Sequence, residues 1–161
     1  MALRYIRIDD DDLLRKKSKP VTEINGKILT LLDDMKDTLV SANGLGLAAP
    51  QVGVLRRVVI IKTDDAYYEM INPEIVEARD SQTKSEACLS VPGKQGKVER
   101  PAYVKIRATN RDGEEYEAEG TELLAVAFSH EIDHLDGVLF IDKATEITDR
   151  ADGDEEDAEE V

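Results

Sequence analysis

Both histidines of this 161-residue chain lie in the segment FSHEIDHLDG, residues 128–137, and a glutamate directly follows the first. On a helix, their spacing of four residues places His130 and His134 one turn apart on the same face. Such a helix can hold one metal ion with both imidazoles, while Glu131 accepts a proton from a water molecule whose pKa the metal lowers. The segment therefore predicts a metal-bearing helix around which the chain must fold, although a solvent-exposed helix can carry the same pattern.

Two histidines leave a catalytic metal site one protein ligand short, because such sites use three protein ligands and an open position. The third histidine of the extended metalloprotease pattern would fall on residue 140, which is Phe140. The carboxylates of Asp142 and Glu146 follow the helix so closely that we expect them at the surface. The only cysteine, Cys88, lies in the polar segment SEACLSVPG and is the better candidate, because a nearby dication stabilises a thiolate. The alternative is that Cys88 fills the core as a small hydrophobic residue.

The glycine-rich segment GLGLAAPQVG, residues 44–53, matches the dinucleotide-binding fingerprint G-x-G-x-x-G/A, and Asp64 and Asp65 follow at about the expected 20 residues. That fingerprint requires a strand before it and a helix that begins within it. Here a helical pattern precedes the glycines and a strand pattern follows Pro50, so nucleotide binding is disfavoured. The loop is instead expected to bring backbone N–H groups close to a ligand, and the amide of Gln51 would suit a developing oxyanion.

Apolar spacing predicts two principal helices. The first is an amphipathic helix over about 24–42, and the second begins after Thr121, which we expect to cap it, and ends at Gly137. Strands are predicted at four segments: RVVIIKT, YYEMINPEIV, YVKIRATN and EYEAEG. Short strands flanked by two principal helices indicate an α+β fold.

The formal net charge of −14 argues against binding to nucleic acid or to an anionic membrane surface. No apolar run approaches the roughly 20 residues that span a bilayer, and the start of the chain lacks a signal-peptide pattern, so we expect a cytoplasmic protein. The last 12 residues, RADGDEEDAEEV, contain seven acidic side chains and one basic one. We therefore expect a catalytic domain over 1–147 and a disordered acidic tail over 148–161 that activity does not require.

Three stretches resemble the signature motifs of bacterial peptide deformylase. GLGLAAPQ (44–51) is similar to G-x-G-x-A-A-x-Q, EACLS (86–90) to E-G-C-L-S, and HEIDH (130–134) to H-E-x-D-H. Each motif is weak alone, and their order and spacing make the combination highly specific. The similarity also includes DDLLRKKSKPV, INPEI, VKIRATNRDG and HLDGVLFID, and covers about residues 4–143.

The resemblance implies antiparallel sheets around the metal-bearing helix, and a hydrolase that removes the formyl group from the N-terminal formylmethionine of newly made proteins, releasing formate. Its metal ligands would be Cys88, His130 and His134, and Glu131 would be the general base and acid. The implied metal is iron(II), with zinc, nickel or cobalt as substitutes, and the ligand types alone do not separate zinc from iron(II). The implied partners are N-formylmethionyl nascent peptides, close to the ribosome.

The same resemblance assigns roles to side chains and backbone groups near the ligands. Gln51 and the backbone N–H of Leu89 would stabilise the formyl oxyanion. Glu86 and Arg100 would form an ion pair that supports the cysteine loop, and the alternative for them is a pair of exposed charges of little energetic value.

The substrate is expected to pair with the protein as an added strand and to place its methionine side chain in an apolar pocket beside the metal helix. The backbone from Leu45 to Gly46 and at Ala87 would form the strand contacts. The matching pocket positions are Leu45, Leu123, Val126 and Ala127.

Two residues depart from the motifs of the family. Ala87 stands where glycine is usual before the cysteine, and Ser129 stands where glutamine is common before the first histidine. Neither change removes a reacting group, so we expect activity, with a substrate preference or rate that differs from the typical one. The alternative is a catalytically weak or inactive paralogue that binds nascent peptides. A metalloprotease is a third hypothesis, against which the missing downstream ligand argues.

Overall fold

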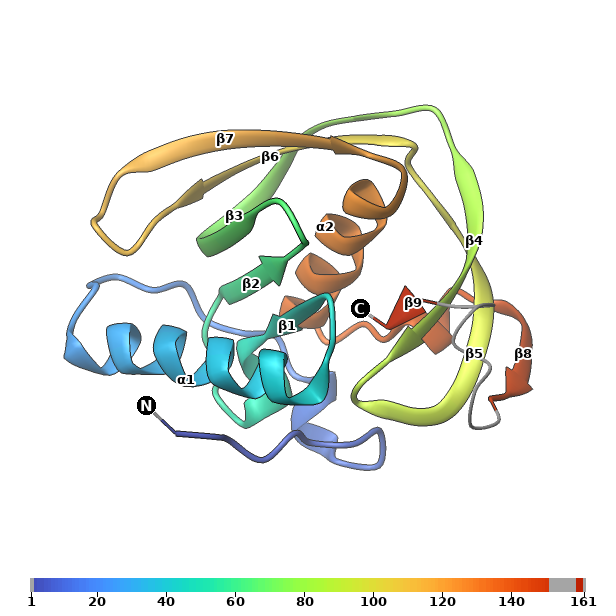
Figure 1. Cartoon of the computed structure of the whole chain (residues 1–161), viewed down its shortest axis with the longest axis horizontal. Coiled ribbons are helices and arrows are strands. Elements are labelled where there is room, and N and C mark those ends of the chain that lie inside the picture. The colour runs from blue at the N-terminus through green and yellow to red at the C-terminus, as the bar shows by residue number, and fades with distance from the viewer. Residues whose placement is uncertain (1, 151–158, 161) are drawn as a thin grey trace.

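The computed structural model describes residues 2–150 and 159–160 of the chain. A five-stranded sheet and a four-stranded sheet enclose the helix α2 (Glu122–Leu135), as Figure 1 shows. The strand orders are β1-β2-β3-β6-β7 in the first sheet and β8-β5-β4-β9 in the second. The described pairings between these strands are antiparallel except that of β4 with β9. The fold is therefore α+β with antiparallel sheets around the histidine-bearing helix, as predicted.

The remaining elements are listed here in chain order: η1 (Asp12–Arg15), α1 (Gly26–Ala42), β1 (Gly46–Ala48), η2 (Ala49–Val52), β2 (Val58–Lys62), β3 (Tyr67–Arg79), β4 (Gln82–Cys88), β5 (Val91–Arg100), β6 (Tyr103–Thr109), β7 (Glu115–Thr121), η3 (Phe140–Asp142), β8 (Thr145–Asp149) and β9 (Glu159–Glu160). The four strands predicted from the sequence correspond to β2, β3, β6 and β7. Within the segment expected to be a loop at residues 43–53, the structure has the short strand β1 and the 3-10 helix η2.

The first sheet is covered on both faces by helices, and β2 shows why. Its run of four apolar residues is fully buried because successive side chains point to opposite faces. Val59 and Ile61 pack in a core cluster with α2 residues such as Phe128, whereas Val58 and Ile60 pack with α1 residues such as Met35. One apolar strand thus joins two cores, and the position of α2 is fixed by the first of them.

The second sheet is built on the hairpin of β4 and β5, which the sequence analysis did not predict. Strand β4 has the sequence QTKSEAC and β5 the sequence VPGKQGKVER, and both are mostly polar or glycine, so their period-two pattern is weak. The hairpin buries a few apolar side chains against distant segments, in a core cluster made of Leu14, Cys88, Val91, Val98, Leu139 and Phe140. Only Leu89 and Ser90 separate the two strands, so Cys88 lies at the tip of β4 beside a tight turn.

The helix α2 is buried along most of its length, with ten of its fourteen residues inaccessible. Thr121 precedes it in the N-cap position, but its side chain makes no capping hydrogen bond, so the predicted cap is wrong in that respect. The helix ends as predicted near Gly137, whose φ of 76° is left-handed and whose N–H donates to the carbonyl oxygen of His134. A Cβ at Gly137 would overlap the backbone carbonyl of Arg15, which requires glycine here.

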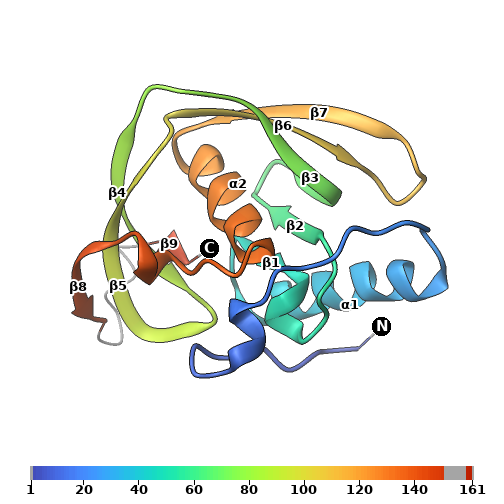
Figure 2. The same ribbon diagram turned by 180° about the vertical axis from the view of Figure 1, so that it is seen from behind.

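The N-terminal segment crosses the end of α2, as Figure 2 shows from behind. The N–H of Ser18 donates to the carbonyl oxygen of Leu135 at 2.8 Å, and Arg57 Nη1 donates to the same oxygen at 3.1 Å. These bonds satisfy a backbone acceptor at the helix end and fasten the helix that bears both histidines.

The end of the chain follows the second sheet. Strand β8 pairs with β5 as far as Asp149, two residues beyond the domain boundary expected at 147, and β9 pairs with β4. Residues 151–158 and 161 of the expected acidic tail lie outside the described residues. Within the described part, no helix is long and apolar enough to cross a membrane.

Candidate metal centre

Three side chains from two elements converge at the junction of α2 and the β4–β5 hairpin. Within the described residues, Cys88, His130 and His134 form the one set of three metal-binding side chains whose ligand atoms all lie within 4.8 Å of one another. His134 Nε2 lies 3.4 Å from Cys88 Sγ and 3.3 Å from His130 Nε2. Each of the three residues is only 1% exposed. The sequence prediction that these residues come together is therefore matched by their positions.

The spacing of the ligand atoms fits a single tetrahedral ion. Metal bonds of about 2.0 Å to imidazole and 2.3 Å to thiolate place neighbouring ligand atoms roughly 3.3–3.6 Å apart. Two of the three separations between ligand atoms, 3.3 and 3.4 Å, lie in that range, and all three are within 4.8 Å. Two imidazole nitrogens and one thiolate also form a ligand set typical of zinc and of other divalent transition metals. The residues present therefore fit a divalent transition metal with one position left open.

The downstream alternatives for the third ligand are engaged elsewhere. Phe140 occupies the place of the protease histidine, and its ring stacks on the His130 imidazole at a centroid distance of 6.2 Å. The carboxylate of Asp142 binds Arg15, and that of Glu146 binds Lys97 at 2.9 Å. These residues pack beside the site or lie at the surface, as the sequence analysis expected.

A buried ion pair orients the first histidine. Glu86 Oε1 lies 2.9 Å from His130 Nδ1, and the same carboxylate accepts two hydrogen bonds from Arg100, both at 2.9 Å. Glu86 and Arg100 are 1% and 3% exposed, so the exposed-charge alternative is wrong. Burial alone would raise the pKa of Glu86, but hydrogen bonds from Arg100 and His130 hold it below its usual range. An ionised Glu86 keeps the proton of His130 on Nδ1 and leaves Nε2 free to bind a metal.

Asp133 extends this network, and the sequence analysis did not single it out. Its Oδ2 accepts from Arg100 Nη1 at 2.7 Å and lies 2.9 Å from Lys143 Nζ. Asp133 is the aspartate of HEIDH, directly before the second histidine, and this position in the motif could have marked it as a residue of the site. Through Arg100, it links the outer face of α2 to the carboxylate that holds His130.

Glu131 is a fully buried carboxylate that has no hydrogen-bond partner among the described residues. Neither Oε1 nor Oε2 is bonded, although the residue is 0% exposed. Burial, and then the charge of Glu86, raise the pKa of the Glu131 carboxyl well above its usual range. A buried carboxylate without a partner is costly, and such groups concentrate where a reacting molecule completes the bonding. Glu131 is therefore placed to exchange a proton.

Two residues from the glycine-rich segment complete the surroundings. A Cβ at Gly46 would lie 2.8 Å from Glu131 Oε2, so the absence of a side chain makes room for the carboxylate. Gln51 is fully buried, and its Oε1 accepts from the N–H of Ala48 at 2.9 Å. Its Nε2 donates to Ser90 Oγ at 3.0 Å and approaches Cys88 Sγ at 3.7 Å. Gln51 thus directs its amide group at the turn that carries Cys88, and its second hydrogen bond is a long one to sulfur that a ligand oxygen can replace.

Ser90 is a second residue that the sequence analysis left without a role. It accepts a hydrogen bond from the Gln51 amide, and its own N–H donates to Cys88 Sγ at 3.4 Å, so it contacts both the amide and the candidate ligand. Ser90 is the last residue of the motif EACLS, and this position could have marked it as a residue of the site. Leu89, the other residue of the turn, is half-buried and packs against the core cluster under α1.

The four residues predicted to line the methionine pocket are buried or half-buried. Ala127 is fully buried in the core cluster beneath α2, and Leu45 is half-buried against the same cluster. Val126 is 2% exposed and Leu123 is half-buried. An apolar pocket at these positions stays a prediction.

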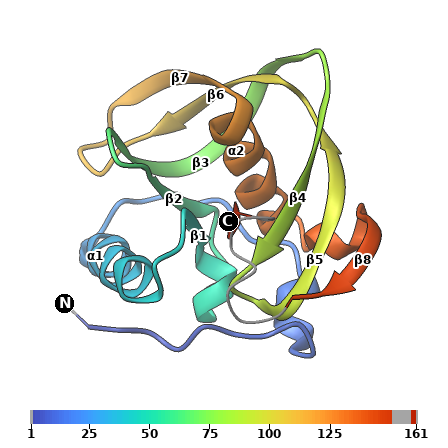
Figure 3. The same ribbon diagram turned by 45° about the vertical axis from the view of Figure 1, so that its right-hand side comes forward.

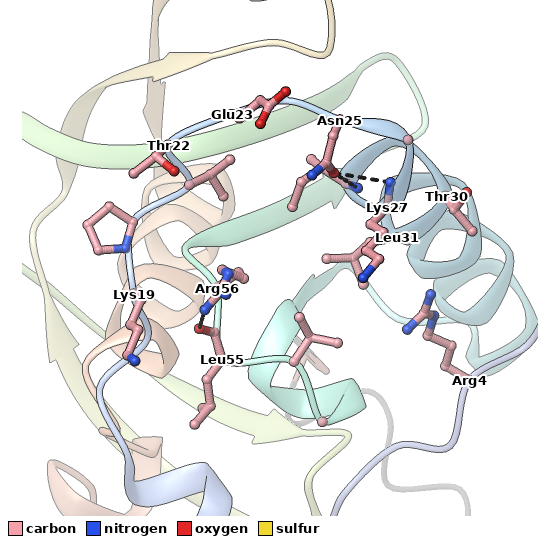
Figure 4. A pocket seen from close by; sticks show the side chains of 16 residues that line it. Arg4, Lys19, Thr22, Glu23, Asn25, Lys27, Thr30, Leu31, Leu55 and Arg56 are labelled. Carbon is pink, nitrogen blue, oxygen red and sulfur yellow. Dashed lines mark hydrogen bonds between the residues drawn. The ribbon is translucent and has the colours of Figure 1, made fainter.

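A large hollow lies elsewhere on the molecule. A cavity of about 1020 Å³ lies between the segment 19–28, residues 53–56 and α1. Figure 4 shows the basic side chains of Arg4, Lys19 and Arg56 around it. It shares no residue with the metal centre. The candidate site is therefore identified by the convergence of its side chains rather than by the size of a hollow.

The two departures from the family motifs are accommodated locally. Ser129 is 5% exposed, and its hydroxyl donates to the carbonyl oxygen of Ala125 at 3.0 Å, one turn earlier in the same helix. Ala87 is 1% exposed in β4, where its backbone pairs with Glu160 of β9. Neither residue displaces a member of the metal-ligating group.

Comparison with known proteins agrees with this geometry. The family model described as polypeptide deformylase matches residues 3–150. A peptide deformylase of Acetivibrio thermocellus is 58% identical, covering 92% of this chain and 88% of that protein. One of Thermoanaerobacter pseudethanolicus is 53% identical, covering 100% and 98%. A crystal structure of a peptide deformylase from Legionella pneumophila superimposes with a TM-score of 0.86 at 40% identity, covering 89% and 87% of the two chains. One from Synechococcus elongatus in complex with actinonin has a TM-score of 0.84 at 36% identity, covering 87% and 78%.

Proposed function

Because the chain belongs to the polypeptide deformylase family, we propose that Cys88, His130 and His134 are the metal ligands of a deformylase and that Glu131 is its proton carrier. Members of this family are metallohydrolases that remove the formyl group from the N-terminal formylmethionine of newly made proteins, and this chain does the same. The observation that supports the residue assignment is the convergence of three ligand atoms beside a buried carboxylate that lacks a hydrogen-bond partner.

The reaction breaks an amide bond, so a proton must reach the departing nitrogen and a negative charge must be stabilised on the formyl oxygen. When bound, a divalent metal polarises the formyl carbonyl and lowers the pKa of a water molecule. Glu131 accepts the proton of the attacking water and returns it to the nitrogen that becomes the free amine. Gln51 Nε2 and the N–H of Leu89 donate to the oxyanion, and Ser90 positions the Gln51 amide for that task.

Iron(II) is the proposed native metal, with zinc, nickel and cobalt as functional substitutes. The two-histidine, one-cysteine ligand set suits both iron(II) and zinc, and the proposal of iron rests on the family resemblance. Elemental analysis of protein purified without oxygen tests it. We expect about one iron per chain, and zinc as the sole metal under those conditions would contradict the proposal.

The proposed partners are the N-formylmethionyl ends of nascent chains, met close to the ribosome in the cytoplasm. The support is the substrate class of the family, since newly made proteins carry the formyl group. Release of formate from formyl-Met-Ala-Ser by iron-loaded protein tests the function. Full metal occupancy without formate release would overturn it, and peptide binding without release would favour the catalytically weak paralogue.

Gly46→Ala should impair catalysis by displacing the proton carrier. The added Cβ would lie 2.8 Å from Glu131 Oε2 and 2.9 Å from its Cγ, so the carboxylate must move. A displacement on the order of 1 Å in a catalytic group can cost about 10²-fold, and we expect a loss of kcat/KM of that size with unchanged metal content. Gly26→Ala is the matched control, because nothing lies within 4 Å of its Cβ. Equal kcat/KM in both variants would show that Glu131 has room to adjust.

Glu86→Gln should weaken metal binding without removing a ligand. The neutral amide no longer stabilises the proton on His130 Nδ1, and it leaves the buried Arg100 with a weaker partner. Outer carboxylates that orient ligating histidines are worth about 10–100-fold in metal affinity, and we expect a loss in that range in a competitive chelator titration. Glu74→Gln, which removes an exposed charge beside Arg107, should leave the affinity unchanged. A normal affinity in Glu86→Gln would reduce Glu86 to a packing role.

A further inference from the structure

The metal centre lies between the edges of two sheets. Strand β1 is an outer strand of the first sheet and contains Gly46, beside Glu131. Strand β4 ends at Cys88, and among the described strands it is β9 that lies beside it on the side away from β5. Figures 1 and 3 show β9 between β4 and β1. An extended peptide that enters between these edges meets the ligands and the proton carrier together.

We infer that the acidic C-terminal segment of the chain, through Glu159 and Glu160, occupies the strand position beside Cys88 that a substrate peptide requires, and so competes with substrate. The backbone of Glu159 pairs with Glu86, and that of Glu160 pairs with Ala87, in parallel. Cys88 is the next residue of β4, so the pairing ends one position before a metal ligand. This inference rests on the proposed function, because competition requires that the centre acts on an extended peptide.

The burial of the centre explains why this edge matters. Cys88, His130 and Glu131 are each at most 1% exposed, so a peptide reaches them only by lying along a neighbouring backbone. The N–H and carbonyl groups at the edge of β4 offer that backbone, because an unpaired edge accepts a further strand. In the structure, a strand of the chain itself takes this place.

Enough residues lie between Arg150 and Glu159 to connect β8 with β9. Strand β8 is fixed on β5 by the Lys97–Glu146 pair at 2.9 Å, and the N–H of Arg150 donates to the carbonyl oxygen of Gly93 at 2.8 Å. In the order β8-β5-β4-β9, the outer strands are three spacings apart, roughly 14–15 Å. The residues numbered 151–158 can extend over roughly 26–29 Å.

The competition is expected to be weak and reversible. Two paired residues bind feebly, but a short tether holds them at a local concentration on the order of millimolar. Where docked and undocked forms are about equally populated, half of the molecules accept substrate and KM is raised about twofold. The parallel backbone pairing does not depend on the chemistry of the metal.

The test is the full-length double variant Glu159→Pro/Glu160→Pro, which removes two backbone N–H donors and keeps the length of the chain. The control is Glu155→Pro/Glu156→Pro, with the same change in charge and proline content outside β9. We expect the β9 variant to show a KM for formyl-Met-Ala-Ser at least about twofold lower than that of the control, with the same kcat. Without substrate, its amides at 86–88 should exchange hydrogen faster.

The two readouts separate this inference from the proposed function. Equal KM and equal amide exchange in the β9 variant and its control would overturn the inference. Faster exchange at 86–88 with no formate release from any metal-loaded protein would support the docking and overturn the function. Equal exchange with normal formate release would overturn the docking and leave the function standing.

Discussion

Replacement of Glu131 by glutamine is expected to lower kcat by about 10²–10⁴-fold, the usual contribution of general acid–base catalysis. Glutamine has nearly the same shape and cannot accept the proton of the attacking water. Because Glu131 is not among the three ligand residues, the variant should keep its metal. The measurement is formate release at saturating peptide, together with metal content per chain.

The control for Glu131→Gln is Glu122→Gln, an exposed position on the first turn of the same helix. Thermal unfolding gives a second readout. Glu131 is buried without a hydrogen-bond partner, so its neutral replacement should leave Tm unchanged or raise it. A normal kcat in Glu131→Gln would assign the proton transfer to another group, and a lowered Tm would show that the carboxylate stabilises the fold.

Replacement of Cys88 by alanine is expected to remove the metal and, with it, the activity. The remaining pair of imidazoles lacks the thiolate that makes the ligand set complete. We expect affinity to fall by more than about 100-fold, the upper limit for changes to outer partners of a site. Metal content after dialysis against a weak chelator, followed by formate release, measures both effects. His134→Ala should give the same result.

Cys88 also belongs to the core cluster of the β4–β5 hairpin, so its packing role must be separated from ligation. Val98→Ala removes a larger apolar side chain from the same cluster and leaves every ligand in place. That control should lose stability and keep its metal. If Cys88→Ala kept its metal while both variants were destabilised alike, Cys88 would be core filler, the alternative that the sequence left open.

Local signals predicted four of the five strands of the first sheet and both principal helices, and they failed at β1 and at the second sheet. The apolar run of β2 and the alternation in β6 are readable because helices and strands bury regular stripes. Strands β4 and β5 carry mostly polar letters, and their few apolar residues pack against Leu14 and Leu139, which are distant in sequence. Whether such a hairpin forms depends on tertiary packing, and no short window of the sequence contains both the hairpin and the residues that it packs against.

The sequence also predicted only part of the candidate site. The spacing of His130 and His134 alone predicts two ligands on one helical face, because helical geometry is local. Cys88 is 46 residues from His134, so the local sequence made it the better candidate for the third ligand but left a core role open, and the resemblance to a known set of motifs joined it to the two histidines. The contacts of Ser90 with Gln51 and of Asp133 with Arg100 depend on how hairpin and helix dock. No sequence pattern predicts them.

The positions of the ligands along the chain set a time order for making the enzyme. Cys88 emerges first, but the ligand set is complete only when His134, residue 134 of 161, has been synthesised. Metal uptake by all three ligands must therefore come after His134 has been synthesised and after the hairpin has met the helix, so it cannot direct the earlier steps of folding. Which ion a new molecule receives is decided at that moment, by the metals then within reach of the docked hairpin and helix.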